Sequence, residues 1–138
     1  MLVAGGRAGM AHGRNSRLQD THLLPPQQLR YNLPVICVIA SVALRPSTLD
    51  RYLTELTAVA AQVRAEAGCI EYCPVIDVAS GLKPQIPLRP NTVTIVERWA
   101  SLEALAAHSI APHMQAFRAR SAEYVLDTSL QVLEPANV

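Results

Sequence analysis

The hydrophobic pattern of the first half of the chain predicts a buried strand followed by an amphipathic helix. Leu33 to Leu44 is a nearly continuous apolar run rich in Val and Ile, which favours a buried strand over a helix. Apolar positions then recur at the helical spacing that buries one face, at Leu49, Leu53, Leu56, Ala60 and Val63. We expect Ser47 to cap this helix, with Asp50 three residues later, and Gly68 to end it.

A second strand and a long loop are predicted next. The run from Cys69 to Val78 has a strand-like composition, and alternation places Ile70 and Tyr72 on one face of it. Pro74 lacks a backbone donor, so we expect it at a bulge or on a sheet edge. Residues 79–91 contain three prolines and a glycine and form a loop whose length is typical of lids and partner contacts.

A third strand and a broken helix follow the loop. Residues 92–100 alternate, which predicts that Glu97 and Trp99 point to the same face of the sheet. Ser101 is expected to cap a short helix. Pro112 is expected to interrupt it and to begin another helix, because the residue before a proline is pushed out of helical geometry.

The order of these elements predicts the fold class. The helix that begins at Pro112 is expected to reach Tyr124, and the alternating residues 129–134 form a fourth strand. The order β-α-β-β-α-β predicts an α+β, ferredoxin-like fold with an antiparallel four-stranded sheet and helices on one face. This domain is expected at residues 31–138, and residues 1–30 are predicted to be an irregular N-terminal arm, since they lack sustained periodicity.

The amino-acid composition limits the kinds of protein and partner that are expected. The 138 residues are 50% hydrophobic and carry a net charge of +1, so one globular domain is expected and nucleic acid is not expected as a partner. No apolar run approaches the ~20 residues of a transmembrane helix, so no membrane partner is expected either. Three cysteines are too few for a disulfide framework, which indicates thiols in a reducing cytoplasm.

Residues 92–124 concentrate the groups able to do chemistry. They contain two of the four histidines, the single Trp and the single Phe. His108 would lie near the end of one helix, where the dipole favours the charged form, and His113 in the first turn of the next, where it favours the neutral form. Such opposed environments are typical of an acid and base pair. The expected substrate-binding walls are four apolar side chains, Trp99, Tyr72, Phe117 and Met114.

Structural roles compete with these interpretations. Trp99 can be core packing, and His108 can hydrogen-bond a loop carbonyl. Glu97 lies on an otherwise apolar face, where a buried acid needs a partner, and His108 or Arg118 could supply a structural bridge. His113 is the best single candidate for a catalytic base, with His108 and Glu97 as the other candidate catalytic residues.

The motifs of this region carry a family resemblance. The pattern E-x-G-C-x-x-Y, followed later by E-x-W-x-S-x-E-A-L-x-x-H-x-x-x-x-H, resembles the antibiotic biosynthesis monooxygenase (ABM) family over about residues 33–135. The matching residues are Glu66, Gly68, Cys69, Tyr72, Glu97, Trp99, Ser101, Glu103, Ala104, Leu105, His108 and His113. The resemblance implies a homodimer in which two sheets form a dimeric α+β barrel. It also implies a monooxygenase that oxidises a small aromatic or quinol with O2 and needs neither flavin nor metal, with His113 taking the substrate proton.

Other functions remain open on the same scaffold. The resembled family also contains isomerases and haem-degrading relatives, and residues 33–44 lack the asparagine that the haem-degrading relatives carry on the first strand. A non-oxidative isomerase or degradation enzyme, or a dimeric binding module without catalysis, are therefore the alternatives. No phosphate-binding glycine motif and no recognisable zinc spacing occur, so neither a cofactor nor a metal is expected.

Overall fold

The computed structural model of the chain describes residues 35–136. The predicted N-terminal arm, residues 1–30, lies outside this range, as does the beginning of the predicted first strand. The strands are β1 (Ile36–Leu44), β2 (Cys69–Val75), β3 (Thr92–Trp99) and β4 (Val125–Leu133). The helices are α2 (Leu49–Arg64), α3 (Leu102–Ser109) and α4 (Pro112–Ser121).

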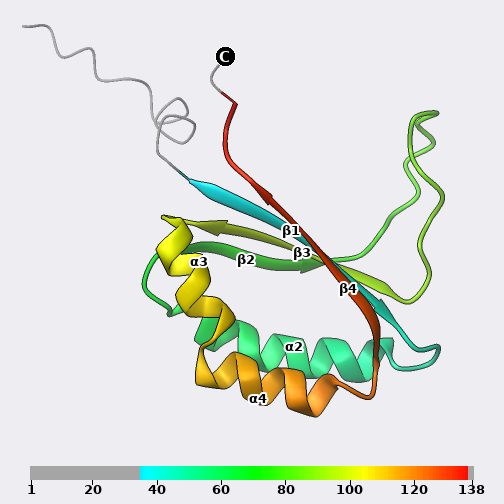
Figure 1. Cartoon of the computed structure of the whole chain (residues 1–138). Coiled ribbons are helices and arrows are strands. Elements are labelled where there is room, and N and C mark those ends of the chain that lie inside the picture. The colour runs from blue at the N-terminus through cyan, green and yellow to red at the C-terminus, as the bar shows by residue number, and fades with distance from the viewer. Residues whose placement is uncertain (1–34, 137–138) are drawn as a thin grey trace, which may run out of the picture.

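The four strands form one sheet in the order β2-β3-β1-β4, and every pair of neighbours is antiparallel. The helices all lie against one face of this sheet (Figure 1). The ferredoxin-like α+β prediction is therefore confirmed, with the second helical segment divided into α3 and α4 at the predicted proline. Among the described residues, no helix is long and apolar enough to cross a membrane.

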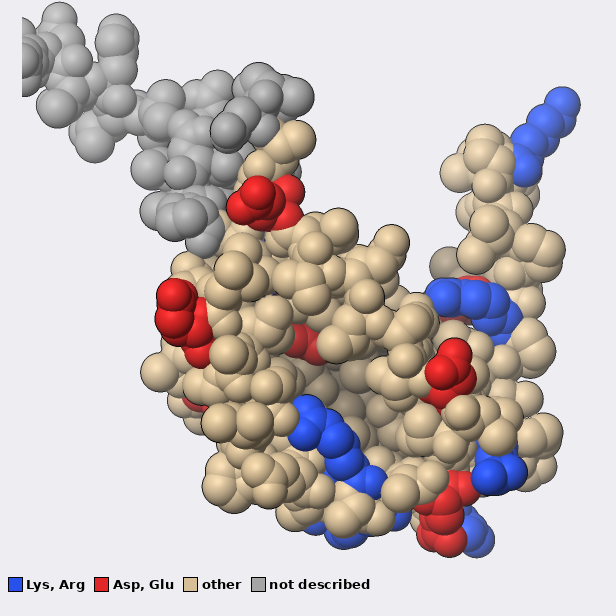
Figure 2. Space-filling model, in the orientation of Figure 1, with Lys and Arg blue, Asp and Glu red and all other residues tan. Residues whose placement is uncertain are grey.

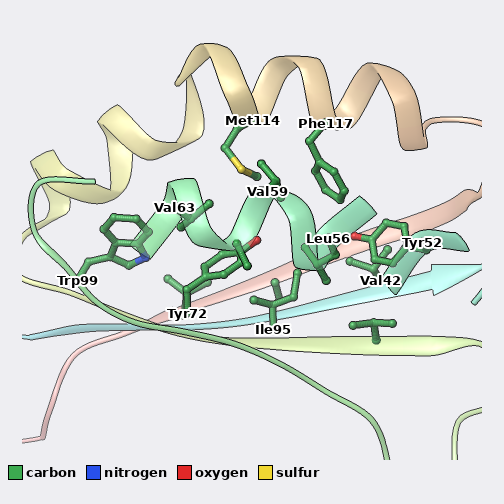
Figure 3. Packing of buried hydrophobic residues seen from close by; sticks show 14 of the residues in the cluster. Val42, Tyr52, Leu56, Val59, Val63, Tyr72, Ile95, Trp99, Met114 and Phe117 are labelled. Carbon is green, nitrogen blue, oxygen red and sulfur yellow. The ribbon is translucent and has the colours of Figure 1, made fainter. Parts of the chain in front are cut away.

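The core lies between the sheet and the helices. Leu56, Val59 and Val63 of α2 are almost completely buried and face Tyr72 and Trp99 of the sheet (Figure 3). Large-to-small changes at such positions typically cost ~2–5 kcal/mol, because the cavity left behind refills only in part. The packing of one helix face therefore fixes α2 on the sheet below it.

The beginning of α2 differs from the prediction. Ser47 does not cap the helix, since its backbone is left-handed with φ 68° and α2 begins two residues later at Leu49. Thr48 occupies the cap position without a side-chain capping bond, and its hydroxyl instead donates to the carbonyl of Arg45 at 2.7 Å. Ser47 belongs to the turn after β1, so the predicted cap position was wrong by one residue.

A bulge in β2 changes which side chains reach the core. Cys69 pairs with Trp99, but the next paired residue is Glu71, so the register shifts between them. Tyr72 is buried opposite Glu97, whereas Ile70 is 53% exposed. The predicted shared face of Ile70 and Tyr72 was therefore wrong, because the extra residue breaks the alternation.

The last strand is longer than predicted and is poorly covered. It begins at Val125 instead of residue 129, and α4 ends at Ser121 instead of Tyr124. Strand β4 pairs with β1 along nearly its whole length, and this pairing sets where β4 begins. The local periodicity of the sequence does not show it. All residues of β4 after Val125 are exposed in the single chain.

Candidate functional site

A cavity of about 560 Å³ opens between the sheet and the helices α3 and α4. Its floor includes Val38 and Ile95, its opposite wall includes Met114 and Phe117, and Leu130 of β4 borders it. The space-filling view shows this face of the molecule hollowed and bordered mostly by uncharged side chains (Figure 2). Concave and mostly apolar sites with few polar groups are typical of small-molecule binding.

Glu66, two residues after the end of α2, holds both predicted histidines together. Its two carboxylate oxygens lie 3.0 and 3.1 Å from Nδ1 of His108. The same Oε1 also makes a short hydrogen bond with Nε2 of His113. An ionised carboxylate only accepts hydrogen bonds, so both of these ring nitrogens are the donors.

His108 is the histidine that borders the cavity. Its ring lies 4.7 Å from that of Trp99 and 5.8 Å from that of Tyr72, measured between centroids, so its plane is fixed by packing. Since Nδ1 donates to Glu66, the neutral ring has Nε2 as its acceptor. Nε2 makes no hydrogen bond within residues 35–136 and is not among the enclosed unpaired atoms of this range, so it is accessible, and the ring that carries it lines the cavity.

Glu97 is a buried acid on the cavity wall. The indole Nε1 of Trp99 donates to its Oε2 at 2.8 Å, so Trp99 is the hydrogen-bond partner, and neither His108 nor Arg118 is. Burial raises the pKa of Glu97, while the Trp99 hydrogen bond and the nearby His108 lower it in part. Arg118 instead donates to the carbonyl of Ser109 at 2.7 Å.

The predicted site residues fall into two groups. Five of them border the cavity, namely His108, Glu97, Tyr72, Phe117 and Met114. Trp99 is completely buried behind His108, which makes it a support for that ring and not a wall of the cavity. His113 is hydrogen-bonded to Glu66 and does not line the cavity. Its predicted role as the catalytic base stays a prediction.

Glu66 is the residue that the sequence reasoning missed. It was part of the family motif, but its position near the end of α2 suggested no chemistry. The motif itself could have identified it, because its first position is a glutamate two residues before Gly68. Among the described residues, no group of three or more His, Cys, Asp or Glu side chains is arranged to hold a metal ion.

The chain matches a family model and a curated relative. The family model for antibiotic biosynthesis monooxygenase matches residues 35–120. The chain is 31% identical over 103 residues to the probable quinol monooxygenase YgiN of Escherichia coli K12. This match covers 73% of this chain and 98% of that protein.

Solved structures have the same fold. PA3566 from Pseudomonas aeruginosa matches with a TM-score of 0.63 at 22% identity, covering 75% of this chain and 96% of that one. Rv0793 from Mycobacterium tuberculosis matches with a TM-score of 0.62 at 26% identity, covering 75% and 97%. The matches support a monooxygenase-type function. By both its family match and its relatives, the chain belongs to the antibiotic biosynthesis monooxygenase family.

Proposed function

We propose that this protein is a cofactor-independent monooxygenase that oxidises a small aromatic substrate, a quinol, with O2. The observation that carries the proposal is the orientation of His108, whose Nδ1 is held by Glu66 while Nε2 is open to the cavity. A carboxylate that fixes the tautomer and plane of an imidazole prepares its other nitrogen to act as a base. The similarity to a relative named as a quinol monooxygenase supports the choice of substrate.

The first step in this proposal is proton removal from a substrate hydroxyl by Nε2 of His108. The anion that forms is electron-rich and reacts with O2 directly. For a hydroquinone, the balanced outcome is a hydroxyquinone and water, with one oxygen atom of O2 in each product. Tyr72 and Phe117 supply flat apolar surfaces for the ring, and the apolar lining limits the water that would solvate the anion.

His113 and Glu97 have separate parts in this proposal. His113 donates to Oε1 of Glu66, and its side chain is 22% exposed, so it connects the partly buried carboxylate to solvent. Glu97 has one oxygen occupied by Trp99, which leaves the other to orient a substrate hydroxyl in the cavity. His108 thus replaces His113 as the proposed base, because only His108 borders the cavity.

We also propose that the protein is a homodimer that pairs the sheet faces not covered by helices. Arg98 lies on this face, where its Nε is enclosed and has no hydrogen-bond partner within residues 35–136. A facing chain would supply an acceptor and would cover the exposed strand β4. Cys37, Cys69 and Cys73 are free thiols, which fits the reducing cytoplasm that we propose as its compartment.

Oxygen uptake with a panel of hydroquinones tests the function. Uptake above the rate of spontaneous oxidation, with one ¹⁸O atom from ¹⁸O2 in the organic product, is the expected result. His108→Gln is expected to abolish this uptake, whereas His113→Gln is expected to slow it only in part. Product formation without oxygen uptake would identify a non-oxidative enzyme instead, and full activity of His108→Gln would refute the proposed base.

A further inference from the structure

The segment between β2 and β3 projects from the body of the molecule. This projecting loop, residues 76–91, leaves the end of the sheet and rises on the side away from the helices (Figure 1). Five of its aliphatic side chains are more than half exposed, namely Ile76, Val78, Leu82, Ile86 and Leu88. Aliphatic side chains gathered on one exposed segment are typical of a surface that contacts another molecule.

The projecting loop is nevertheless braced by its own polar groups. Asp77 and Arg89 close its base through an ion pair of 2.6 Å, and the backbone N–H of Arg89 donates to the same carboxylate at 2.9 Å. Farther out, the amide of Gln85 donates to the carbonyl of Val78 at 2.7 Å and accepts from the hydroxyl of Ser80 at 2.6 Å. These bonds fix the loop in shape before it meets a partner, which lowers the entropy cost of docking.

The base of the loop is anchored to the face of the sheet that has no helices. Arg89 donates to Thr94 of β3 at 2.9 Å and reaches Ser41 of β1 at 3.4 Å. Thr94 and Ser41 are paired across the two strands, on the face opposite to Glu97. A second chain lying on this face would therefore be within reach of the loop.

Strand β4 offers a matching surface on a second copy. It is an edge strand, and exposed apolar side chains lie on both of its faces: Leu133 is on the face without helices, whereas Leu130 and Val132 pair with Ala40 and Val38 on the cavity side. The loop of a second copy that packs along this free edge would contact both faces. Residues 121–136 contain Glu123, Asp127 and Glu134 and no Lys, Arg or His, so this part of the chain is acidic. In the loop, Asp77 and Arg89 neutralise each other, which leaves Lys83 as the unpaired charge. The two surfaces are thus complementary in both apolar character and charge.

We propose that the projecting loop of one copy docks on strand β4 of a second copy, twice across a two-fold axis. The loop covers aliphatic side chains that would otherwise be exposed on both partners, and Lys83 approaches the acidic groups that flank β4. This contact goes beyond the proposed pairing of sheet faces, because it assigns a specific segment to a specific strand of the partner. Since Leu130 also borders the cavity, docking would place the partner beside the site.

Lys83 is the only lysine of the sequence, which allows a sharp test. A carbodiimide that joins amines to carboxylates is applied to the full chain, as an equal mixture of unlabelled and ¹⁵N-labelled protein. We expect a covalent dimer, and mixed-label peptides that join Lys83 to Asp127, Glu134 or Glu123. Lys83→Arg is the matched control, because it keeps the charge but removes the reactive amine, and it must lose these peptides.

A second measurement examines the apolar part of the contact. The double variant Val78→Asp and Leu82→Asp is expected to weaken dimerisation at least tenfold in sedimentation equilibrium. Leu102→Asp is the matched control, because Leu102 is 57% exposed but lies on α3, away from the loop. A dimer whose Lys83 joins only helix carboxylates such as Glu55, or whose affinity survives the double variant, would refute the docking and leave the dimer intact. A monomeric wild-type chain would refute both.

Discussion

Replacing Glu66 with Gln is the sharpest test of how the site is organised. The carboxylate accepts from Nδ1 of His108 through both oxygens and from Nε2 of His113 through one. A glutamine has one acceptor oxygen and an NH2 group that can only donate. If the NH2 group faces His108, Nδ1 must become the acceptor, and the ring proton moves to Nε2. That tautomer cannot accept a proton from a substrate in the cavity.

The size of the effect follows from the bonds that are lost. A hydrogen bond to a charged group contributes about 1.5–3 kcal/mol, and each 1.36 kcal/mol of transition-state stabilisation is worth tenfold in rate. Losing the bond that orients His108 therefore predicts a fall in kcat of about 10- to 150-fold. The KM is expected to change little, because Glu66 does not border the cavity.

Oxygen uptake under saturating hydroquinone measures this effect, and circular dichroism with urea unfolding verifies that the variant is folded. Glu103→Gln is the matched control, because Glu103 is an exposed acid on α3 with no contact to the histidines, and it should keep wild-type kcat. A folded Glu66→Gln variant with kcat within twofold of wild type would show that the carboxylate does not orient the base. The proposed role of His108 would then fail as well.

Two further substitutions test the burial of Glu97 and the backbone conformation of Gly68. Burial raises the pKa of Glu97 above its unfolded value of about 4.3, so the folded state holds the proton more tightly and the free energy of unfolding falls as pH rises above that value. The Glu97→Gln variant does not have this loss, and its amide oxygen can still accept from Trp99. Its melting temperature relative to that of wild type should therefore rise as the pH is raised above that value, and a constant difference would contradict the burial argument. Gly68→Ala should cost about 2–4 kcal/mol in urea unfolding, because φ is +82° and the new Cβ would lie 2.6 Å from that of Ala104. Gly81→Ala is its matched control, with φ +76° and no atom within 4 Å, and an equal loss there would show that the contact with Ala104 is unimportant.

Most of the fold could be predicted because its signals are local. Alternation in β3, the helical spacing of α2 and the proline between α3 and α4 each act within a few residues, and all three predictions match the structure. The bulge at Ile70 and the early start of β4 depend on the strands beside them, β3 and β1. Periodicity within one strand carries no information about its neighbour, so these features were missed.

The site could be predicted only in part for a related reason. His108 and Glu97 were marked by their chemistry and by strand or helix position, and the cavity indeed lies between them. Glu66 is separated from His108 by 42 residues and from His113 by 47, so no local pattern joins the three. What brings them together is the packing of α3 against the turn that follows α2.

Two backbone features explain why one carboxylate can reach both histidines. On a continuous helix, residues five apart point ~140° from one another, since each residue turns the helix by ~100°. His108 and His113 are five apart, but Pro112 begins a new helix between them, which frees their directions from this constraint. Gly68 then lets the turn after α2 approach α3 so closely that a Cβ at this position would overlap that of Ala104. Ala104 lies one helical turn before His108, so this close approach places Glu66 directly beside the base. A change at Gly68 should therefore reduce kcat as well as stability, although Gly68 does not line the cavity.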